Sequence, residues 1–197
     1  MREILRAIRF TLILWVLVAV IYPFSMLAIG QVVFPHQANG SLLKNAQGQV
    51  IGSTLIGQPF ASDRYFHSRP STSSYSTADP KNDSANLLKT GVSGASNLAP
   101  SNPDLAERIQ TSVKALKRSG IQPSADLVYT SGSSLDPHIT PATAKAQVDR
   151  VATTRGLQPN QVEILVASNT EGRFLGIFGE PGVNVLKLNL ALDALKL

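Results

Sequence analysis

The feature that most constrains this chain is a run of 25 residues, Phe10 to Phe34, that holds no charged side chain. At a rise of about 1.5 Å per residue, a helix of this length is roughly 37 Å long, whereas the hydrocarbon core of a bilayer is about 30 Å thick. A buried helix of a soluble core is disfavoured because no face of the segment is polar enough to meet water. The run therefore predicts one tilted transmembrane helix over residues 10–34.

The charges on either side of the run indicate its orientation. Three arginines lie within the first nine residues, and the next basic residue downstream is Lys44. Basic residues favour the cytoplasmic side of a membrane. We therefore expect residues 1–9 in the cytoplasm and residues 35–197 in an extracytoplasmic domain.

A cleaved signal peptide is the main alternative, because it also starts with basic residues followed by an apolar run. The apolar core of a signal peptide is usually about 7 to 15 residues long, much shorter than this one. The triplet Ala28-Ile29-Gly30 is also a poor small-residue cleavage site. We therefore expect an uncleaved membrane anchor.

The composition excludes several kinds of chemistry. The chain has no cysteine, which rules out disulfides, thiolate zinc sites, iron–sulfur clusters and a cysteine nucleophile. None of its histidines, His36, His67 and His138, has a partner at the spacing of a metal motif. Beyond residue 9 there are 15 basic and 12 acidic residues, with no basic cluster interleaved with aromatics. Nucleic acid is therefore not an expected partner, and we expect neither a catalytic residue nor a metal or cofactor ligand.

The region after the span reads as a mixture of helices and short strands. Apolar spacing, with capping and stop signals, predicts helices over residues 104–119, 141–155 and 159–169. Short apolar runs predict strands at residues 127–130 and 183–189, before a terminal apolar helix. The mixed order favours an α+β class: a single N-terminal transmembrane helix followed by a mixed α+β extracytoplasmic domain.

Two stretches look irregular. Residues 34–49 read as a loop, with turn signals at Asn39-Gly40 and Gly48. Residues 68–102 consist mostly of Ser, Thr, Asn, Gly and Pro. A structureless stretch of that length is unusual in a compact domain and is often functional, so it is the predicted docking region.

Three short patterns are those of penicillin-recognising serine enzymes, which also act outside a membrane anchor. Ser41 and Lys44 fit SxxK, residues 84–86 fit SxN, and residues 89–91 fit KTG. In those enzymes the last two patterns close opposite sides of a cleft, whereas here only two residues separate them. Chance matching in a Ser-rich segment explains the patterns better. A membrane-anchored extracytoplasmic serine enzyme is kept only as an alternative.

Longer segments carry a more specific resemblance. They are YP inside the span, FPHQANGSL after it, GSTLIGQPF, YFHSRPS, SGASNLAPSNPDL, SGSSLDPHITPATAKAQVDRVATTRGL and EGRFLGIFGEPGVNVLKLNLALD. Over residues 10–193 the chain resembles the C subunit of the bacterial Kdp potassium-transporting P-type ATPase. The resemblance implies one span and one outer domain, in agreement with the topology that the arginines indicate.

The resemblance also implies a location and partners. In that complex the A subunit conducts potassium, the B subunit hydrolyses ATP through a phosphorylated aspartate, and a small F subunit accompanies them. The chain is then a non-catalytic accessory subunit in the bacterial inner membrane, with a periplasmic domain, and its partner handles K⁺. A stand-alone periplasmic binding protein is the other alternative.

The resemblance further implies a catalytic chaperone that raises the ATP affinity of the B subunit, and ATP enters as a cofactor on that ground alone. The stretch that corresponds to a nucleotide-binding signature, Val92 to Leu98, lacks the paired glycines and the glutamine of that signature. It is also expected on the side of the membrane opposite cytoplasmic ATP. Any effect on ATP affinity is therefore expected to be allosteric.

Nine residues are expected to contact partner subunits. In the span, a proline and a glycine shape the helix and allow close approach, and a glutamine bonds across the interface. Outside it, aromatic and arginine side chains are favoured at interfaces. The expected contacts are Tyr22, Pro23, Gly30, Gln31, Gln58, Phe60, Tyr65, Phe66 and Arg69. Two alternatives stay open: a lipid-facing kink at Pro23, and a core position for each of the outer residues.

We predict that a protease added to intact spheroplasts digests the chain beyond residue 40, because the arginines hold the N-terminus in the cytoplasm. Immunoblotting against an N-terminal tag detects the fragment that remains. Complete protection of the domain would reverse the predicted orientation.

Overall fold

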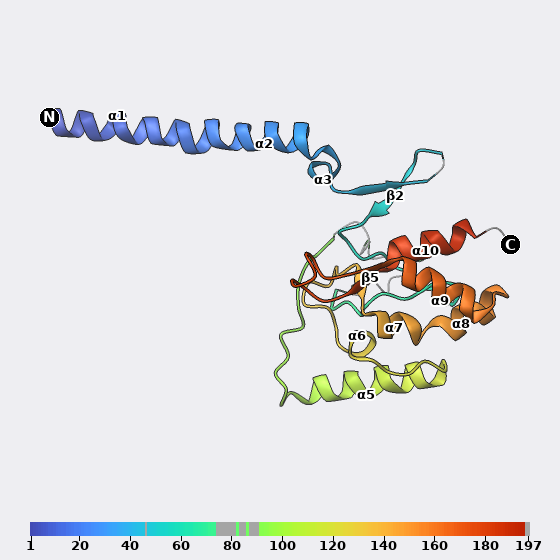
Figure 1. Cartoon of the computed structure of the whole chain (residues 1–197). Helices are drawn as coiled ribbons and strands as arrows, with labels where there is room; N and C mark the ends of the chain where they lie inside the picture. Colours follow the sequence, from blue (N-terminus) through green and yellow to red (C-terminus); the bar gives the residue numbers. More distant parts are fainter. Residues whose placement is uncertain (46, 74–81, 83–85, 87–90, 196–197) are drawn as a thin grey trace. The chain divides into compact units, whose positions relative to one another are not determined.

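The apolar N-terminal segment forms one helical rod in the computed structural model (Figure 1). Helix α1 spans Arg2–Val16, a π-helical turn η1 spans Leu17–Ile21, and α2 spans Tyr22–Val33. No residue of the rod is buried, and the rod is long and apolar enough to cross a bilayer. The helix predicted from the uncharged run is confirmed, and it fits a single membrane span.

The π-helical turn lies directly before Pro23. A proline has no N–H to donate, and its ring crowds the carbonyl group one turn earlier. In η1 the N–H of Tyr22 donates to the carbonyl of Leu17, five residues back, which widens the turn ahead of the proline. The Oγ of Ser25 donates to the carbonyl of Ile21 at 2.7 Å in the same region. The helix therefore continues through Pro23 instead of ending there.

Two compact units make up the chain, Met1–Ile51 and Gly52–Leu197, and we refer to the second as the C-terminal domain. The structure describes residues 1–45, 47–73, 82, 86 and 91–195. Residues 74–81, 83–85 and 87–90 of the predicted docking region therefore lie outside the described residues.

The loop predicted over residues 34–49 is wrong in part. Helix α3 (Pro35–Ala38) and strand β1 (Leu42–Lys44) lie within it, and β1 pairs with β2 (Val50–Ser53). The side chain of Asn45 stabilises the connection, because its Oδ1 accepts from the N–H of Gln49 at 2.9 Å. The elements are only three or four residues long, too short for apolar periodicity to indicate.

The C-terminal domain contains a small antiparallel sheet. Its strands lie in the order β3 (His138–Ile139), β5 (Gly182–Asn184) and β4 (Thr170–Glu171), with Val183 opposite both Ile139 and Thr170. The helices are α5 (Pro103–Arg118), α6 (Ala125–Val128), α7 (Pro141–Lys145), α8 (Val148–Arg155), α9 (Pro159–Ser168) and α10 (Val185–Ala194). Figure 1 shows α7 to α10 grouped together and α5 at the edge of the domain. The predicted α+β class is confirmed.

Local sequence signals locate several helices. The helices predicted over residues 104–119 and 159–169 are confirmed as α5 and α9. The remaining predicted helix is divided into α7 and α8. Thr140 caps α7 by accepting from the N–H of Thr143 at 3.2 Å. Gly156 ends α8 with a φ of +69°, a left-handed conformation that glycine adopts without strain.

One predicted strand is wrong, and another is confirmed only at its start. Residues 127–130 were expected to be extended, but Leu127 and Val128 belong to the helical turn α6. The prediction was wrong because an apolar run of four residues is too short to distinguish a strand from a helix. The strand predicted over residues 183–189 stops at Asn184. There the side-chain Oδ1 of Asn184 accepts from the N–H of Lys187 at 3.1 Å and starts α10. A helix cap therefore overrides the alternating pattern that follows it.

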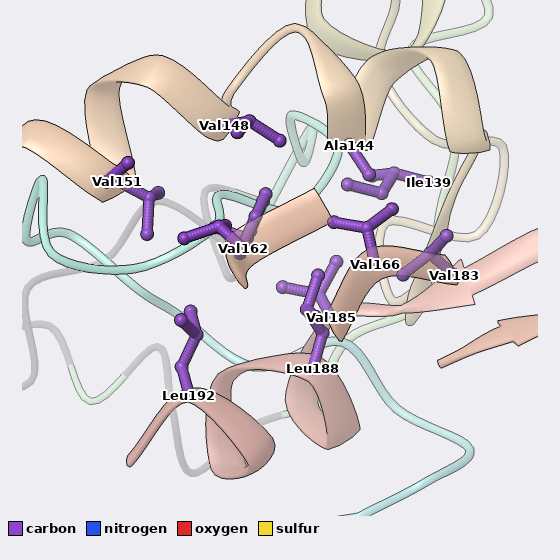
Figure 2. Close-up of a cluster of buried hydrophobic side chains, with 12 residues drawn as sticks. Ile139, Ala144, Val148, Val151, Val162, Val166, Val183, Val185, Leu188 and Leu192 are labelled. Atoms are coloured by element: carbon purple, nitrogen blue, oxygen red, sulfur yellow. The ribbon is translucent and has the colours of Figure 1, made fainter. Parts of the chain in front are cut away.

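The core of the C-terminal domain lies between the sheet and helices α7 to α10 (Figure 2). The labelled side chains are Ile139, Ala144, Val148, Val151, Val162, Val166, Val183, Val185, Leu188 and Leu192. Most are valines, whose branched side chains have few rotamers to lose on packing. Each large apolar side chain contributes about 1.5–3 kcal/mol when it is fully buried.

An extended segment, residues 65–69, runs beside this core without forming a strand, and we call it the strap. Two fully buried amide side chains replace the neighbouring strand that it lacks. Asn189 of α10 accepts from the N–H of Phe66 at 2.9 Å and donates to the carbonyl of the same residue at 3.0 Å. Gln147 does the same for His67, at 2.8 and 3.2 Å. These four bonds satisfy backbone groups that a folded chain does not leave buried without partners.

We predict that Asn189→Leu destabilises the domain, although it adds an apolar side chain to an apolar helix. The variant leaves the N–H and carbonyl of Phe66 without their partner, at a cost of about 1–3 kcal/mol for each group. Asn160→Leu, at an exposed position of α9, is the matched control, expected to change stability by less than about 0.5 kcal/mol. Urea unfolding of the full chain in detergent measures both variants. Equal stability of the two would contradict the role of Asn189.

Candidate functional site

Tyr65 begins the strap, and its side chain is held by three neighbours. Its hydroxyl donates to Oδ2 of Asp193 at 3.0 Å, and the guanidinium carbon of Arg155 lies 4.8 Å from the centre of its ring. Arg155 in turn donates to Oδ1 of Asp193 at 2.7 Å, and the ring of Phe60 lies 5.3 Å from that of Tyr65. Burial and the Asp193 carboxylate raise the pKa of Tyr65. The phenol therefore stays protonated and acts as a fixed donor.

Arg69 ends the strap in a cleft of about 300 Å³ beside the sheet. Its Nη1 donates to Oδ2 of Asp136 at 3.2 Å, and Oδ1 of Asp136 accepts from the N–H of His138 at 3.0 Å. The segment Asp136-Pro137-His138 is therefore a turn that an ion pair joins to the strap. The remaining lining residues are Asp126, Ile139, Thr140, Glu171, Gly172, Glu180, Pro181 and Gly182.

Two carboxylates of the cleft bond to neighbouring groups of the domain. Oδ2 of Asp126 accepts from the N–H of Thr140 at 2.7 Å and from Oγ1 of Thr143 at 3.0 Å. Burial acts to raise the pKa of Asp126, but these bonds hold it below its ordinary value. Oε1 of Glu171 accepts from Nζ of Lys187 at 2.7 Å, which lowers the pKa of Glu171. Among the described residues, no group of three or more His, Cys, Asp or Glu side chains is arranged as a metal site.

The structure brings only some of the expected contact residues of the domain together. Phe60 and Tyr65 share a ring contact and are partly exposed, whereas Arg69 lies in the cleft. Gln58 is partly buried, and its carbonyl accepts from Oγ of Ser68 at 3.3 Å. Phe66 is 0% exposed and belongs to the core, which is the alternative that the sequence left open for it. Its ring therefore presents no surface to a partner.

The expected contact residues of the rod stay accessible. Tyr22 is 60% exposed. Oε1 of Gln31 accepts from Nδ2 of Asn39 at 3.2 Å, a bond within the first unit. A Cβ added at Gly30 would lie 3.8 Å from the Cβ of Ala38, an ordinary contact distance. The packing of this chain therefore does not itself require a glycine at residue 30.

The structure does not favour the serine-enzyme alternative. An SxxK pair works when a helical turn brings both side chains to one face. Here Lys44 lies in strand β1, and Ser41 precedes that strand with a φ of +50°. The SxN and KTG patterns include residues outside the described part of the chain.

The structure shows an exposed apolar loop that was not predicted from the sequence. We call residues Phe174–Phe178, a hairpin loop between β4 and β5, the apolar tip. Four side chains of the tip are largely exposed: Phe174 (72%), Leu175 (74%), Ile177 (73%) and Phe178 (61%). In the sequence, the run FLGIF between Gly172 and Gly179 could have indicated this loop, because glycines on both sides of a short apolar run are typical of a turn.

The buried amides of Gln147 and Asn189 could also have been noticed in the sequence, because each is a polar residue inside an apolar helical pattern.

These features define a class of protein: one exposed apolar helix joined to a small α+β domain whose charged cleft is paired within the fold. The family model described as "KdpC: K+-transporting ATPase, c chain" matches residues 4–194. The chain is 68% identical to the Potassium-transporting ATPase KdpC subunit 1 of Nostoc sp., over 99% of this chain and 97% of that protein. It is 66% identical to the KdpC subunit of Microcystis aeruginosa (98% and 96% covered) and 45% identical to that of Geobacter sulfurreducens (99% and 99%). The chain therefore belongs to the KdpC family of K⁺-transporting ATPase c chains.

We predict that the stability of the chain falls as the pH is lowered below about 6.5, the ordinary pKa of histidine. Burial in the strap, and then the charge of Arg150, lower the pKa of His67 in the folded state. As the pH falls, the unfolded chain therefore binds a proton at His67 before the folded chain does. The free energy of unfolding is thus highest above the ordinary pKa of histidine and decreases below it. Urea unfolding at pH 7.5 and 5.5 should show this loss in the natural chain and a smaller one in His67→Gln. Equal losses in the two chains would contradict the prediction.

Proposed function

We propose that the chain is a non-catalytic accessory subunit of a high-affinity, ATP-driven potassium uptake complex. The observation that carries the proposal is the contrast between its two units. The rod is apolar and unburied, whereas the charged groups of the cleft have partners within the domain: Arg69 bonds to Asp136, and Asp126 accepts from the N–H of Thr140. This contrast supports a role in stabilising an assembly. The name that its relatives carry, potassium-transporting ATPase KdpC subunit, supports a potassium complex.

The proposed location is the bacterial inner membrane, with residues 1–9 in the cytoplasm, residues 10–34 across the bilayer and residues 35–197 in the periplasm. The support is the asymmetry of basic residues around the rod. Lipid surrounds those faces of the rod that no partner covers.

The proposed neighbours are a potassium-conducting A subunit, an ATP-hydrolysing B subunit and a small F subunit. The rod packs against the conducting subunit through a face that holds Tyr22 and Pro23 and, about two turns later, Gly30 and Gln31. A glycine inside a helix costs about 1 kcal/mol relative to alanine, and this chain's own packing gives no reason for it at residue 30. Close approach of a second helix supplies the missing reason.

The C-terminal domain then covers or stabilises the entrance of the conducting subunit. The proposed contacts are Gln58, Phe60, Tyr65 and Arg69, with Phe66 acting from the core by holding the strap in place. Asp193 and Arg155 keep the ring of Tyr65 in one orientation before any partner arrives. A contact that is already ordered loses less entropy on binding.

Any effect on ATP affinity is proposed to be allosteric. It requires that the chain bind two conformations of the complex with different affinity. The stretch Val92 to Leu98 is not a free phosphate cradle, since the N–H of Gly94 donates to the carbonyl of Ser133 at 3.1 Å. The carbonyl of Gly94 accepts from Oγ of Ser134. These groups of the stretch are used within the domain.

The proposal is tested by purifying the tagged chain in mild detergent, identifying the proteins that accompany it and measuring potassium-stimulated ATPase activity. Co-purification of the conducting and hydrolysing subunits, with activity, supports it. If neither subunit accompanies the chain, the proposal fails.

We predict that Gly30→Leu lowers the recovery of the partner subunits by about tenfold, which corresponds to about 1.4 kcal/mol of lost association energy. Ala28→Leu is the matched control, because two positions along a helix turn the side chain to nearly the opposite face. Quantitative immunoblotting of the purified complex measures both variants. Equal recovery with the two would contradict the proposed face of the rod.

A further inference from the structure

The large side chains of the apolar tip take no part in the core of the C-terminal domain. Its four large side chains are each more than 60% exposed, and none of them belongs to the core. The tip also has no polar side chain, although charged residues stand beside it. Nη2 of Arg173 donates to both carboxylate oxygens of Glu180, at 2.9 and 2.8 Å, and this ion pair closes the base of the hairpin.

The conformation of the tip adds a second unfavourable feature. Leu175 has a φ of +53° and Gly176 a φ of +77°, and the N–H of Ile177 donates to the carbonyl of Phe174 at 3.2 Å. Both φ angles lie in the left-handed region, which Gly, Asn and Asp adopt more readily than other residues. A leucine there is strained by roughly 1–3 kcal/mol. Leu175 is thus unfavourable in two ways: its apolar side chain is exposed to water, and its backbone has a positive φ.

The backbone of the tip is closed on itself. Phe174 and Phe178 exchange N–H to carbonyl bonds at 2.8 and 2.9 Å. The N–H groups of Gly176 and Ile177 also donate within the hairpin. A segment can enter hydrocarbon only if its backbone groups bond internally. Four of the five N–H groups of the tip, and the carbonyls of Phe174 and Phe178, meet this condition. This suits the interfacial region of a bilayer, where water is still present, better than the hydrocarbon core.

The arrangement of the side chains favours a surrounding apolar medium over a flat protein surface. Neighbouring residues of a hairpin strand point to opposite faces. Phe174 and Phe178 pair directly across the hairpin, so they share one face, whereas Leu175 and Ile177 belong to the turn beyond them. All four side chains are more than 60% exposed. Both the paired phenylalanines and the turn residues beyond them are therefore apolar and uncovered by the domain, as a tip surrounded by an apolar medium requires.

The chain itself keeps the tip close to a membrane. The rod ends at Val33 and the C-terminal domain begins at Gly52, so 18 residues connect them. Fully extended, they reach at most about 60 Å. A domain of this size has a radius of gyration of about 15 Å. The bilayer that holds the rod is therefore within reach of the tip at high effective concentration.

We propose that the apolar tip inserts into the interfacial region of the bilayer that the rod spans, as a second, shallow membrane contact. The phenylalanine, leucine and isoleucine side chains enter the boundary between headgroups and acyl chains, and the Arg173–Glu180 ion pair stays at the headgroups. The proposal rests on the membrane span in the proposed function and on no contact with a partner subunit.

The test uses the absence of cysteine from the natural chain. Leu175→Cys is labelled with an environment-sensitive fluorophore, and the full chain is reconstituted into vesicles of phosphatidylethanolamine and phosphatidylglycerol. Asn160→Cys, at an exposed polar position of α9, is the control, and Ile177→Cys is a second variant in case the first disturbs the turn. Spin-labelled lipids with the label near the headgroup should quench the tip at least about threefold more than the control, with a blue shift of its emission.

Two results would overturn the proposal: quenching at the tip no greater than at the control, or a tip that is shielded only when the other subunits are added. The second result would assign the tip to a protein socket. Failure of the proposed function is detected separately, by loss of co-purification. The tip can be quenched by lipid in a chain that recruits no partner.

Discussion

The structure depends on a backbone that is buried without a neighbouring strand. The strap is stable beside the core because Asn189 and Gln147 bond to both backbone groups of two successive residues, Phe66 and His67. If either side chain is replaced by an apolar one, the free energy lost at the unpaired backbone groups exceeds the free energy gained by burying the apolar side chain. The two ends of the strap join it to other elements, at Tyr65 through Asp193 and at Arg69 through Asp136. A segment with no regular secondary structure thus connects α8, α10 and the turn before β3.

Much of the architecture follows from local signals in the sequence. The uncharged run gives the rod, and caps such as Thr140 and stops such as Gly156 locate helices, because these effects act within one turn. The strand expected over residues 183–189 ends early, at Asn184, because the side chain of that residue starts a helix there. The bonds of the strap join residues 80 or more positions apart, which no local pattern reveals. The exposure of the apolar tip likewise depends on how the whole domain packs.

The two units divide the physical tasks of a membrane subunit. The rod supplies anchorage, since its apolar surface gains free energy only in lipid or against another apolar helix. The C-terminal domain supplies fixed groups, because charged side chains such as Arg155 and Lys187 pair within the fold and the ring of Tyr65 is held by its neighbours. An anchored domain also pays little further translational entropy when it meets a partner in the same membrane. Under the proposed function, this is how the chain would stabilise an assembly whose chemistry lies on another subunit.

The central claim is that the chain acts on an ATP-driven potassium complex without taking part in its chemistry. The most direct measurement compares potassium-stimulated ATP hydrolysis by the complex assembled with and without this chain, over a range of ATP concentrations. The account predicts that removal of the chain weakens the apparent ATP affinity or dissociates the complex, and that adding the chain back restores both. An unchanged ATP dependence in a complex that stays intact without the chain would contradict it.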